Sequence, residues 1–313
     1  MVVTNVTPLS RALPFCFVLL LTLGCGRKAK EEPLPEQSAP PPIVIAPSAP
    51  TATAPRYFGR VVALCVGIER YASPAITPAE ASERDAAELA RLFRERYGYE
   101  TVELIGAQAT RERVLGELDR LKRELGERDA LVVFFAGHGR VVDLPSFGRA
   151  GYLVPYDAPL DLTDAGRADE WAARAIDMRA LAASVEGASS AHVVFLIDAC
   201  FSGFMARRGV SPAQSEAVAR RSRCVVAATT DSQKATRDAA TGHGHFTGAV
   251  LARLGGSDAK SLTDLYAQVR EDVVKSSKRQ MLPQRGDFGG EDGEFVFIPL
   301  AVPVAEVDGA MKY

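Results

Sequence analysis

Short apolar runs alternate with amphipathic segments along most of this chain, and this alternation constrains its fold more than any other feature. Runs with few charges are typical of strands buried on both faces, whereas apolar residues at every third or fourth position are typical of one face of a helix. Alternating strands and helices form a mainly parallel sheet with helices on both sides, so we expect an α/β fold. Strands are predicted at 61–66, 101–105, 131–136, 192–197, 224–228 and 294–298, and helices at 77–97, 110–125, 178–185, 245–255 and 262–276.

Capping residues set the predicted boundaries of the first two helices. Thr77 is the expected N-cap of the first helix, with Pro78 in the first turn and Glu80 completing a capping box. Gly98 ends this helix, and Thr110 opens the next one. The apolar stripes are Ala86, Leu89, Phe93 and Tyr97 in the first helix and Val114, Leu118, Leu121 and Leu125 in the second.

The residues that precede this pattern indicate export. Residues 12–24 form an apolar run that is too short for a comfortable transmembrane helix and has the geometry of a signal peptide. The run leads into 21-LTLGC-25, which resembles a bacterial lipobox with Cys25 as the lipidated residue, although two positions depart from the usual pattern. A plain secretory signal and an uncleaved anchor are the open alternatives. Because Gly26 follows in place of an aspartate, we expect a lipid anchor at the bacterial outer membrane, and otherwise a periplasmic or secreted protein.

A proline-rich stretch separates this segment from the folded part of the chain. Its sequence, 33-PLPEQSAPPPIVIAPSAPTATAP-55, has a composition that gives an extended tether without a core. We interpret it as a spacer, and binding by a proline-reading partner is the alternative. The predicted organisation is a signal peptide with a lipobox-like end at 1–25, a Pro-rich linker at 26–57, a folded domain at 58–300 and a C-terminal tail at 301–313.

The composition excludes some classes of protein. With 313 residues, of which 47% are hydrophobic, the chain is long enough for one large core or two small ones. A net charge of −2 gives no reason to expect nucleic acid as a partner. Five cysteines are too few for a disulfide scaffold. The folded part holds Cys65, Cys200 and Cys224, an odd number, so at least one of these thiols is unpaired or pairs between chains.

Reactive side chains directly follow two of the predicted strands. One strand leads into 136-AGHGR-140 and the next into 198-DACFSG-203. The ligand crevice of such a sheet lies beyond the carboxyl ends of its strands. If these two strands are neighbours, His138 and Cys200 lie on the same edge of the sheet, where an active site belongs.

A cysteine nucleophile needs a base, because a thiol with its ordinary pKa is mostly protonated at neutral pH. His138 is the best candidate for that base, since glycines on both sides permit a sharp turn and a close approach to a ligand. We expect His192 to be partly exposed at the start of a strand, and His243 and His245 to lie in a loop. The alternative is that Cys200 is a small buried hydrophobe and His138 an ordinary loop residue.

Two backbone amides near these side chains are candidates for stabilising negative charge. Acyl transfer passes through an oxyanion, which hydrogen-bond donors fixed in advance stabilise. We expect the amides of Gly139 and Cys200 to supply these donors.

The two motifs resemble those of the caspase-like cysteine peptidases (peptidase C14 family), most closely the metacaspase branch, whose second motif reads Asp-x-Cys-x-Ser-Gly. The resemblance implies a caspase-hemoglobinase fold, with a mainly parallel six-stranded sheet between helices. It also implies a cysteine endopeptidase in which Cys200 is the nucleophile and His138 is the general acid and base. The resemblance extends over 59–299 and includes 65-CVGIERY-71, 151-GYLVPYDA-158, 225-VVAATTDSQKA-235 and 242-GHGHFTGAVL-251.

The resemblance also implies the residue after which such an enzyme cuts. Acids line the P1 pocket of metacaspases and select arginine or lysine, and Asp198 and Asp85 match those positions. A pair of carboxylates suits a guanidinium, which binds in bidentate fashion. Asp231 is a further candidate for contact with substrate. Two alternatives stay open: Asp85 as a solvated residue early in a helix, and Asp198 as a cap of its turn through backbone amides.

The sequence departs from the family pattern at two positions near the motifs. Ala136 replaces a serine that contacts the pocket in many relatives, which weakens the inference about P1, and Phe201 stands where histidine is common. Neither change removes the dyad. No cofactor is expected to be required, and calcium activation, which occurs in several metacaspases, is left open because the acids here do not match the order of that site. These acids are Asp161, Asp164, Asp169 and Glu170.

An arginine-rich segment, 205-MARRGVSPAQSEAVARRSR-223, lies between the cysteine motif and the next strand. In caspases the corresponding linker is cut during maturation, so an arginine-specific enzyme would cut itself here. A solvated basic helix and loop is the alternative. The arginines are Arg207, Arg208, Arg220, Arg221 and Arg223.

Three functions compete at this point. The first is a cysteine endopeptidase that is tethered to a membrane by its N-terminal lipid and acts on peptides or proteins with a basic P1 residue. The second is a catalytically silent caspase-like domain that acts as a binding or scaffold module. Silent members usually lose the histidine or the cysteine, and both are present here. The third is a legumain-like or gingipain-like peptidase, which shares the His-Gly and Ala-Cys signature.

Overall fold

The computed structural model of the chain describes residues 43–45, 57–144, 148–159, 168–200, 220–230, 235–290 and 293–300. The predicted signal peptide, most of the predicted linker and the predicted C-terminal tail therefore lie outside the described residues. The single residues named above that also lie outside are Cys25, Gly26, Asp161, Asp164, Phe201, Arg207, Arg208 and Asp231.

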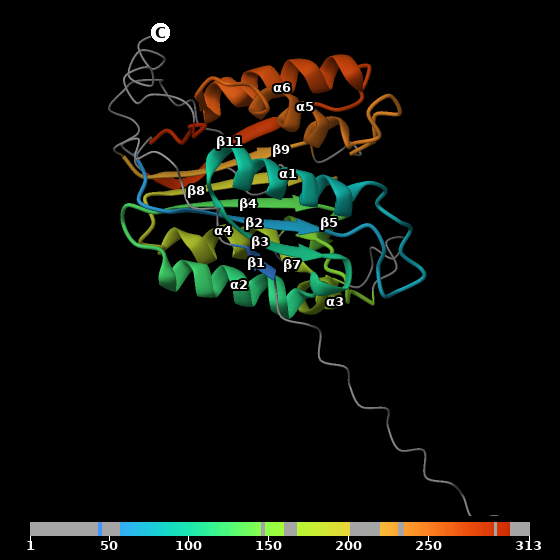
Figure 1. Cartoon of the computed structure of the whole chain (residues 1–313). Coiled ribbons are helices and arrows are strands. Elements are labelled where there is room, and N and C mark those ends of the chain that lie inside the picture. The colour runs from blue at the N-terminus through green and yellow to red at the C-terminus, as the bar shows by residue number, and fades with distance from the viewer. Residues whose placement is uncertain are drawn as a thin grey trace, which may run out of the picture. The chain divides into compact units, whose positions relative to one another are not determined.

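The centre of the fold is a seven-stranded sheet with the strand order β1-β3-β2-β4-β8-β9-β11 (Figure 1). The five strands from β3 to β9 pair in parallel, and β1 and β11 pair antiparallel at the two edges. The predicted six-stranded, mainly parallel sheet is thereby confirmed, and β1, which falls within the predicted linker, adds a short seventh strand. The bounds are β1 Ile43–Ile45, β3 Glu100–Ile105, β2 Val61–Gly67, β4 Ala130–Ala136, β8 His192–Asp198, β9 Ser222–Ala227 and β11 Gln284–Gly290.

Helices cover both faces of this sheet (Figure 1). The helices α1 (Ser82–Tyr97), α5 (His245–Leu254) and α6 (Leu262–Ser276) lie on one face, and α2 (Arg111–Glu124) and α4 (Met178–Glu186) lie on the other. This is the predicted sandwich of helices around the sheet. The shorter helical segments among the described residues are η1 (Gly106–Gln108) and α3 (Ala168–Arg174).

Alternate residues of the central strands point to opposite helical layers, as the pleat of a strand requires. In β8, Phe195 and Ile197 pack with the residues of α2 and α4, whereas Val194 and Leu196 pack with those of α1, α5 and α6. All of β8 is buried, which explains why its sequence is an almost unbroken apolar run. The same alternation turns Asp198, the last residue of β8, toward α1 and α5.

The first helix begins later than predicted. It starts at Ser82, because Ala81 has the left-handed conformation (φ 73°), which a continuing helix excludes. The end of the helix at Gly98 is as predicted. In sequence, Thr77 and Glu80 match the pattern of a capping box. In the structure they lie in a loop, where Thr77 contacts His138 and Glu80 contacts the segment before α5.

The last predicted strand, 294–298, does not belong to the main sheet. Within it, β12 (Val296–Phe297) pairs with β10 (Lys260–Ser261) in a separate two-stranded sheet. The edge of the main sheet is β11, whose sequence QRGDFGG contains three glycines and no β-branched residue. Such a composition carries almost no strand signal, so the sequence did not predict this strand.

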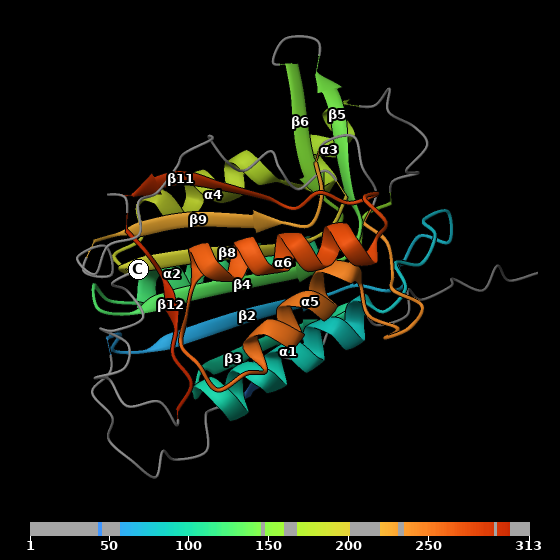
Figure 2. The same cartoon turned by 90° about the horizontal axis from the view of Figure 1, so that it is seen from above.

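The insertion after β4 forms a small sheet that begins beside the candidate site. Here β5 (Gly139–Leu144) pairs with β6 (Gly148–Leu153), which in turn pairs with β7 (Ile176–Asp177). Figure 2 shows β5 and β6 projecting away from the main sheet. Because β5 starts directly after His138, the hairpin helps to fix that residue, whose carbonyl oxygen accepts a hydrogen bond from the amide of Val154 at 3.0 Å.

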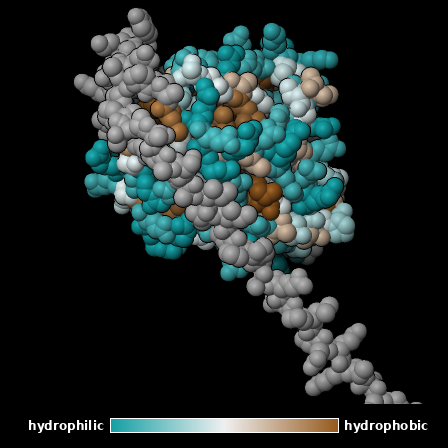
Figure 3. Space-filling model, viewed as in Figure 1, coloured by the Kyte–Doolittle hydropathy of each residue, from teal (hydrophilic) through white to brown (hydrophobic). Residues whose placement is uncertain are grey.

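The described surface seen in Figure 3 is mostly hydrophilic, with a few separate apolar patches. Leu300 is the one large apolar side chain that is exposed among the described residues. In the same part of the chain, no helix has both the length and the apolar character needed to cross a membrane.

Candidate active site

The two predicted catalytic side chains lie at the same edge of the sheet. The parallel strands β4 and β8 are neighbours, and their last residues, Ala136 and Asp198, are paired in register. His138 and Cys200 each follow two residues later. Both line a pocket of about 520 Å³, together with Asp85 and Asp198. The geometry therefore brings together the two predicted catalytic side chains and the two acids that the family resemblance assigns to the P1 pocket.

His138 is fixed by contacts on several sides. Its backbone amide donates to the hydroxyl of Tyr71 at 2.7 Å, and the two rings stack with their centroids 5.3 Å apart. Its Nε2 lies 2.7 Å from the carbonyl oxygen of Thr77. A carbonyl oxygen only accepts hydrogen bonds, so Nε2 carries the hydrogen, and in the neutral ring Nδ1 keeps the lone pair. Burial lowers the pKa of His138 and so favours the neutral ring, and the bond to Thr77 opposes that shift in part.

The backbone around Cys200 is packed closely against the histidine loop. A Cβ atom at Gly139 would overlap the carbonyl oxygen of Cys200, so only glycine permits this approach. The amide of Ala235 donates to the Cys200 sulfur at 3.2 Å, a contact that favours the thiolate. Cys65, Cys200 and Cys224 form no disulfide among the described residues, in agreement with the odd count.

Asp85 and Asp198 are two buried acids that line the pocket. Their exposed fractions are only 2% and 7%, so Asp85 is not the solvated helix residue of the alternative interpretation. A Cβ atom at Gly244 would lie 2.5 Å from Oδ2 of Asp198 and 3.2 Å from Oδ2 of Asp85. Both carboxylates therefore face the same point of the backbone, and glycine is required there for space.

Each carboxylate is held by the segment that begins α5. Oδ2 of Asp198 accepts from the hydroxyl and the amide of Thr247, at 2.6 Å and 3.2 Å. Since Thr247 is in the first turn of α5, Asp198 caps that helix from the end of β8, and not its own turn as the alternative interpretation had it, while also lining the pocket. Asp85 accepts from the amide of Gly244 at 2.8 Å and contacts Nδ1 of His243 at 2.5 Å.

Burial raises the pKa values of both acids. The pKa of Asp198 rises to about 7, because burial outweighs the hydrogen bonds from Thr247 and because the nearby charge of Asp85 adds to the shift. The pKa of Asp85 is also raised by burial, against the opposing contacts from His243 and Gly244. Burial therefore favours the protonated form of both acids, whereas a cation that enters the pocket favours the ionised carboxylates.

A comparison with protein families decides what kind of domain this is. The family model described as Caspase domain matches residues 60–286, which is most of the chain. The chain belongs to the caspase domain family. A comparison with curated proteins gives no match.

The fold of this caspase domain is similar to that of a solved bacterial protein, GSU0716 from Geobacter sulfurreducens. The two share 19% sequence identity with a TM-score of 0.54, over 74% of this chain and 94% of the other. At this level of identity the similarity concerns the fold alone.

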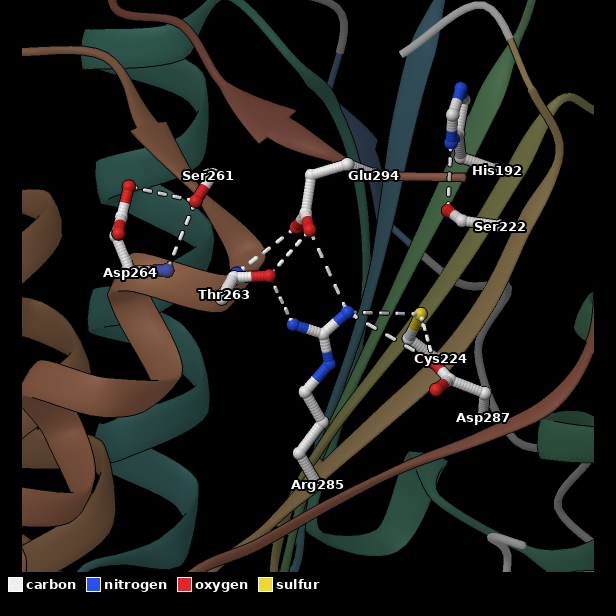
Figure 4. A network of polar contacts seen from close by, with 9 residues as sticks. All are labelled: His192, Ser222, Cys224, Ser261, Thr263, Asp264, Arg285, Asp287 and Glu294. Atoms are coloured by element: carbon white, nitrogen blue, oxygen red, sulfur yellow. Dashed lines mark hydrogen bonds and ion pairs between the residues drawn. The ribbon is translucent and has the colours of Figure 1, made fainter. Parts of the chain in front are cut away.

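A second histidine and cysteine, His192 and Cys224, lie on adjacent strands in the sheet core of the caspase domain (Figure 4). They also supply the functional groups of a dyad. Nδ1 of His192, however, is 2.7 Å from the hydroxyl of Ser222, and the thiol of Cys224 donates to Asp287 at 2.9 Å. Both side chains are buried, and burial raises the pKa of Cys224 far above its usual value. A buried thiol of this kind yields little thiolate, so these contacts favour a structural role.

His192 and His245 differ from their predicted surroundings. His192 is not partly exposed but 1% exposed, because its ring packs edge-on against Phe58 and Phe295 at centroid distances of 5.1 Å and 6.0 Å. His245 is the first residue of α5, whereas His243 lies in the preceding loop as predicted.

The buried side chain of Arg223 contradicts one part of the self-processing prediction. Arg223 is 3% exposed, and its guanidinium donates to four backbone carbonyls, so it is not an exposed cutting site. Arg221 is exposed. Arg207 and Arg208 lie outside the described residues. The carbonyls bound by Arg223 belong to Ala188, Ser190, Ala191 and Ser222.

The sequence missed several residues that hold the site together. Their contacts come from the backbone carbonyl of Thr77, the hydroxyls of Tyr71 and Thr247, and the imidazole of His243. The sequence signal for His243 and Thr247 was 242-GHGHFT-247, a glycine-rich segment at the start of a predicted helix. Among the described residues, no group of three His, Cys, Asp or Glu side chains is placed to hold a metal ion.

Proposed function

We propose that this caspase domain is a cysteine endopeptidase of the metacaspase type, in which Cys200 is the nucleophile and His138 the general acid and base. The observation that carries the proposal is the pocket that His138 and Cys200 share with the acids Asp85 and Asp198. The tautomer imposed by Thr77 supports it further, because it leaves Nδ1 of His138 able to take a proton.

In the proposed reaction, Nδ1 of His138 removes the proton from the Cys200 thiol. The thiolate attacks the peptide carbonyl carbon, forming a C–S bond, and the amides of Gly139 and Cys200 donate to the resulting oxyanion. The imidazolium then protonates the leaving amine as the C–N bond breaks. Water, deprotonated by His138, hydrolyses the thioester and restores the thiol.

The pair of acids supports cleavage after arginine, or after lysine. Thr247 engages Oδ2 of Asp198 among the described residues, which leaves Oδ1 for a ligand. A guanidinium presents several donors in a rigid plane and matches two carboxylates better than an ammonium does. We therefore place the P1 side chain between Asp85 and Asp198, with Asp231 as a further candidate contact.

Hydrolysis of fluorogenic peptides with Arg, Lys, Asp or Asn at P1 tests this function. The purified full-length protein and its Cys200→Ala variant are compared with and without reductant and calcium. We expect turnover of the Arg and Lys peptides that is lost in Cys200→Ala. A preference for Asp would refute the pocket assignment, and absence of any turnover would favour the silent binding or scaffold module.

We also propose that the chain is anchored through a lipid on Cys25 and is cut within 205–223 after an arginine other than Arg223. Labelled palmitate should enter the wild type but not Cys25→Ala in a bacterial host. Terminal sequencing of the matured protein should give a new N-terminus after Arg207, Arg208, Arg220 or Arg221, and Cys200→Ala should stay uncut.

A further inference from the structure

Asp85, one of the two pocket acids, is contacted by a histidine that lies outside the pocket. Nδ1 of His243 contacts Oδ1 of Asp85 at 2.5 Å, and its Nε2 lies 3.4 Å from Oε2 of Glu88. The two acids are three residues apart on α1, a spacing that places them on the same face of the helix. The imidazole therefore links a half-exposed acid at the surface to a buried acid in the pocket.

His243 contacts Asp85 from outside the pocket that is proposed to hold the substrate. Its side chain lines a separate groove of about 470 Å³ between α1 and α5, which Leu92 and Leu251 also line. The residues that line the active-site pocket include Asp85 but not His243. Any effect of His243 on a ligand in the pocket is therefore transmitted through the carboxylate of Asp85.

The loop that carries His243 is itself fastened to α1. Arg84 donates to the carbonyl oxygen of Gly242, and Gly242 has a left-handed backbone (φ 73°) that favours glycine. The next glycine, Gly244, donates its amide to Oδ2 of Asp85. Both oxygens of the Asp85 carboxylate are thus held, one by an imidazole and one by a backbone amide, and the plane of the carboxylate is fixed.

We propose, resting on the proposed function, that His243 is the positioning residue that orients Asp85 for a basic P1 side chain. A guanidinium that binds carboxylate oxygens in bidentate fashion requires a fixed plane, whereas an ammonium acts as a point charge and tolerates rotation. Loss of His243 should therefore weaken the binding of arginine more than that of lysine. It should leave the chemical step at Cys200 unchanged.

Three variants test this assignment in the full-length protein. His243→Ala removes both contacts, and His243→Asn keeps an amide donor near the position of Nδ1. His245→Ala is the matched control, because Nδ1 of His245 contacts Ser276, outside the pocket. The measurements are KM and kcat for peptides with Arg or Lys at P1, and the Kd of benzamidine by calorimetry.

A hydrogen bond to a charged group changes an equilibrium constant by about tenfold, which sets the expected effect. His243→Ala should raise KM for the Arg peptide and the Kd of benzamidine by about tenfold, with kcat within about twofold of the wild type. His243→Asn should restore most of the loss, and His245→Ala should change neither value. In the Asp85→Asn background, His243→Ala should have no further effect, since it acts through Asp85.

An unchanged benzamidine Kd in a folded His243→Ala variant would overturn the assignment. A decrease confined to kcat would also overturn it, as would an equal increase in KM for the Arg and Lys peptides. If His243→Ala does not fold, His243→Gln replaces it, because its longer amide lies near Nε2 and should not rescue Asp85. Absence of peptide hydrolysis by the wild type would contradict the proposed function alone, because benzamidine binding still reports on His243.

Discussion

The Nε2 atom of His138 donates its hydrogen to the carbonyl oxygen of Thr77 across 2.7 Å. A backbone carbonyl thus orients the ring. It leaves Nδ1 as the proton acceptor, and burial favours the neutral ring by lowering its pKa. The tautomer that the proposed reaction requires is thus set by the loop between β2 and α1.

Binding of a cation in the pocket should depend on pH through Asp198. Its pKa is raised to about 7, so the carboxylate is ionised above that value and protonated below it. Benzamidine stays positively charged over this range, and its Kd should be constant above pH 8. Below pH 7 the Kd should increase by up to about tenfold per unit of pH, as expected for competition with one proton. Calorimetry between pH 5 and pH 9 measures this, and a flat Kd would contradict the role of Asp198.

The ionised form of Asp198 should also reduce the stability of the empty protein. Its folded pKa is above the unfolded value, so the stability contributed by the bound proton is present at low pH and is lost as the pH rises to about 7. Asp198→Asn should therefore be more stable than the wild type at pH 8, by on the order of a few kcal/mol, and the difference should decrease toward pH 4.

Denaturant unfolding at several pH values measures this difference. Asp119→Asn, at an exposed acid on α2, is the control and should show no such trend. A wild type that is more stable than Asp198→Asn at pH 8 would mean that the hydrogen bonds from Thr247 outweigh the burial of the charge.

Gly139→Ala should affect catalysis more than folding. The added Cβ overlaps the carbonyl oxygen of Cys200, so it displaces the backbone that carries the proposed nucleophile and the proposed oxyanion donor. A shift of this kind reduces kcat by about 100-fold, while overpacking costs about 1–3 kcal/mol of stability. Gly116→Ala is the matched control, because nothing lies within 4 Å of the added atom there. Equal activities of the two variants would exclude a functional role for the close approach.

Most of the sheet could be predicted because its central strands are buried on both faces. β4 and β8 are buried along their whole length, and such strands must be apolar throughout. The glycine-rich edge strand β11 could not be predicted. It is a strand because it pairs with β9, and its sequence lacks the apolar run of a buried strand. The start of α1 was predicted wrongly because Thr77 and Glu80 are used in long-range contacts.

The candidate site was predicted where a single side chain marks a strand end. His138, Cys200 and Asp198 all follow apolar runs, so the parallel order of the strands places them at one edge. His243 and Thr247 could not be predicted, because their contacts with Asp85 and Asp198 join segments far apart in sequence. These contacts depend on the packing of α1 and α5 over the end of the sheet.

Covalent labelling with a peptidyl-arginine chloromethyl ketone tests the central claim most directly. The thiolate that performs catalysis displaces chloride and forms a C–S bond, and mass spectrometry of the digested protein identifies the cysteine. We predict one adduct on the peptide that contains Cys200, absent in Cys200→Ala and formed much more slowly in His138→Ala. An adduct on Cys224, or active protein without an adduct on Cys200, would contradict the assignment of the nucleophile.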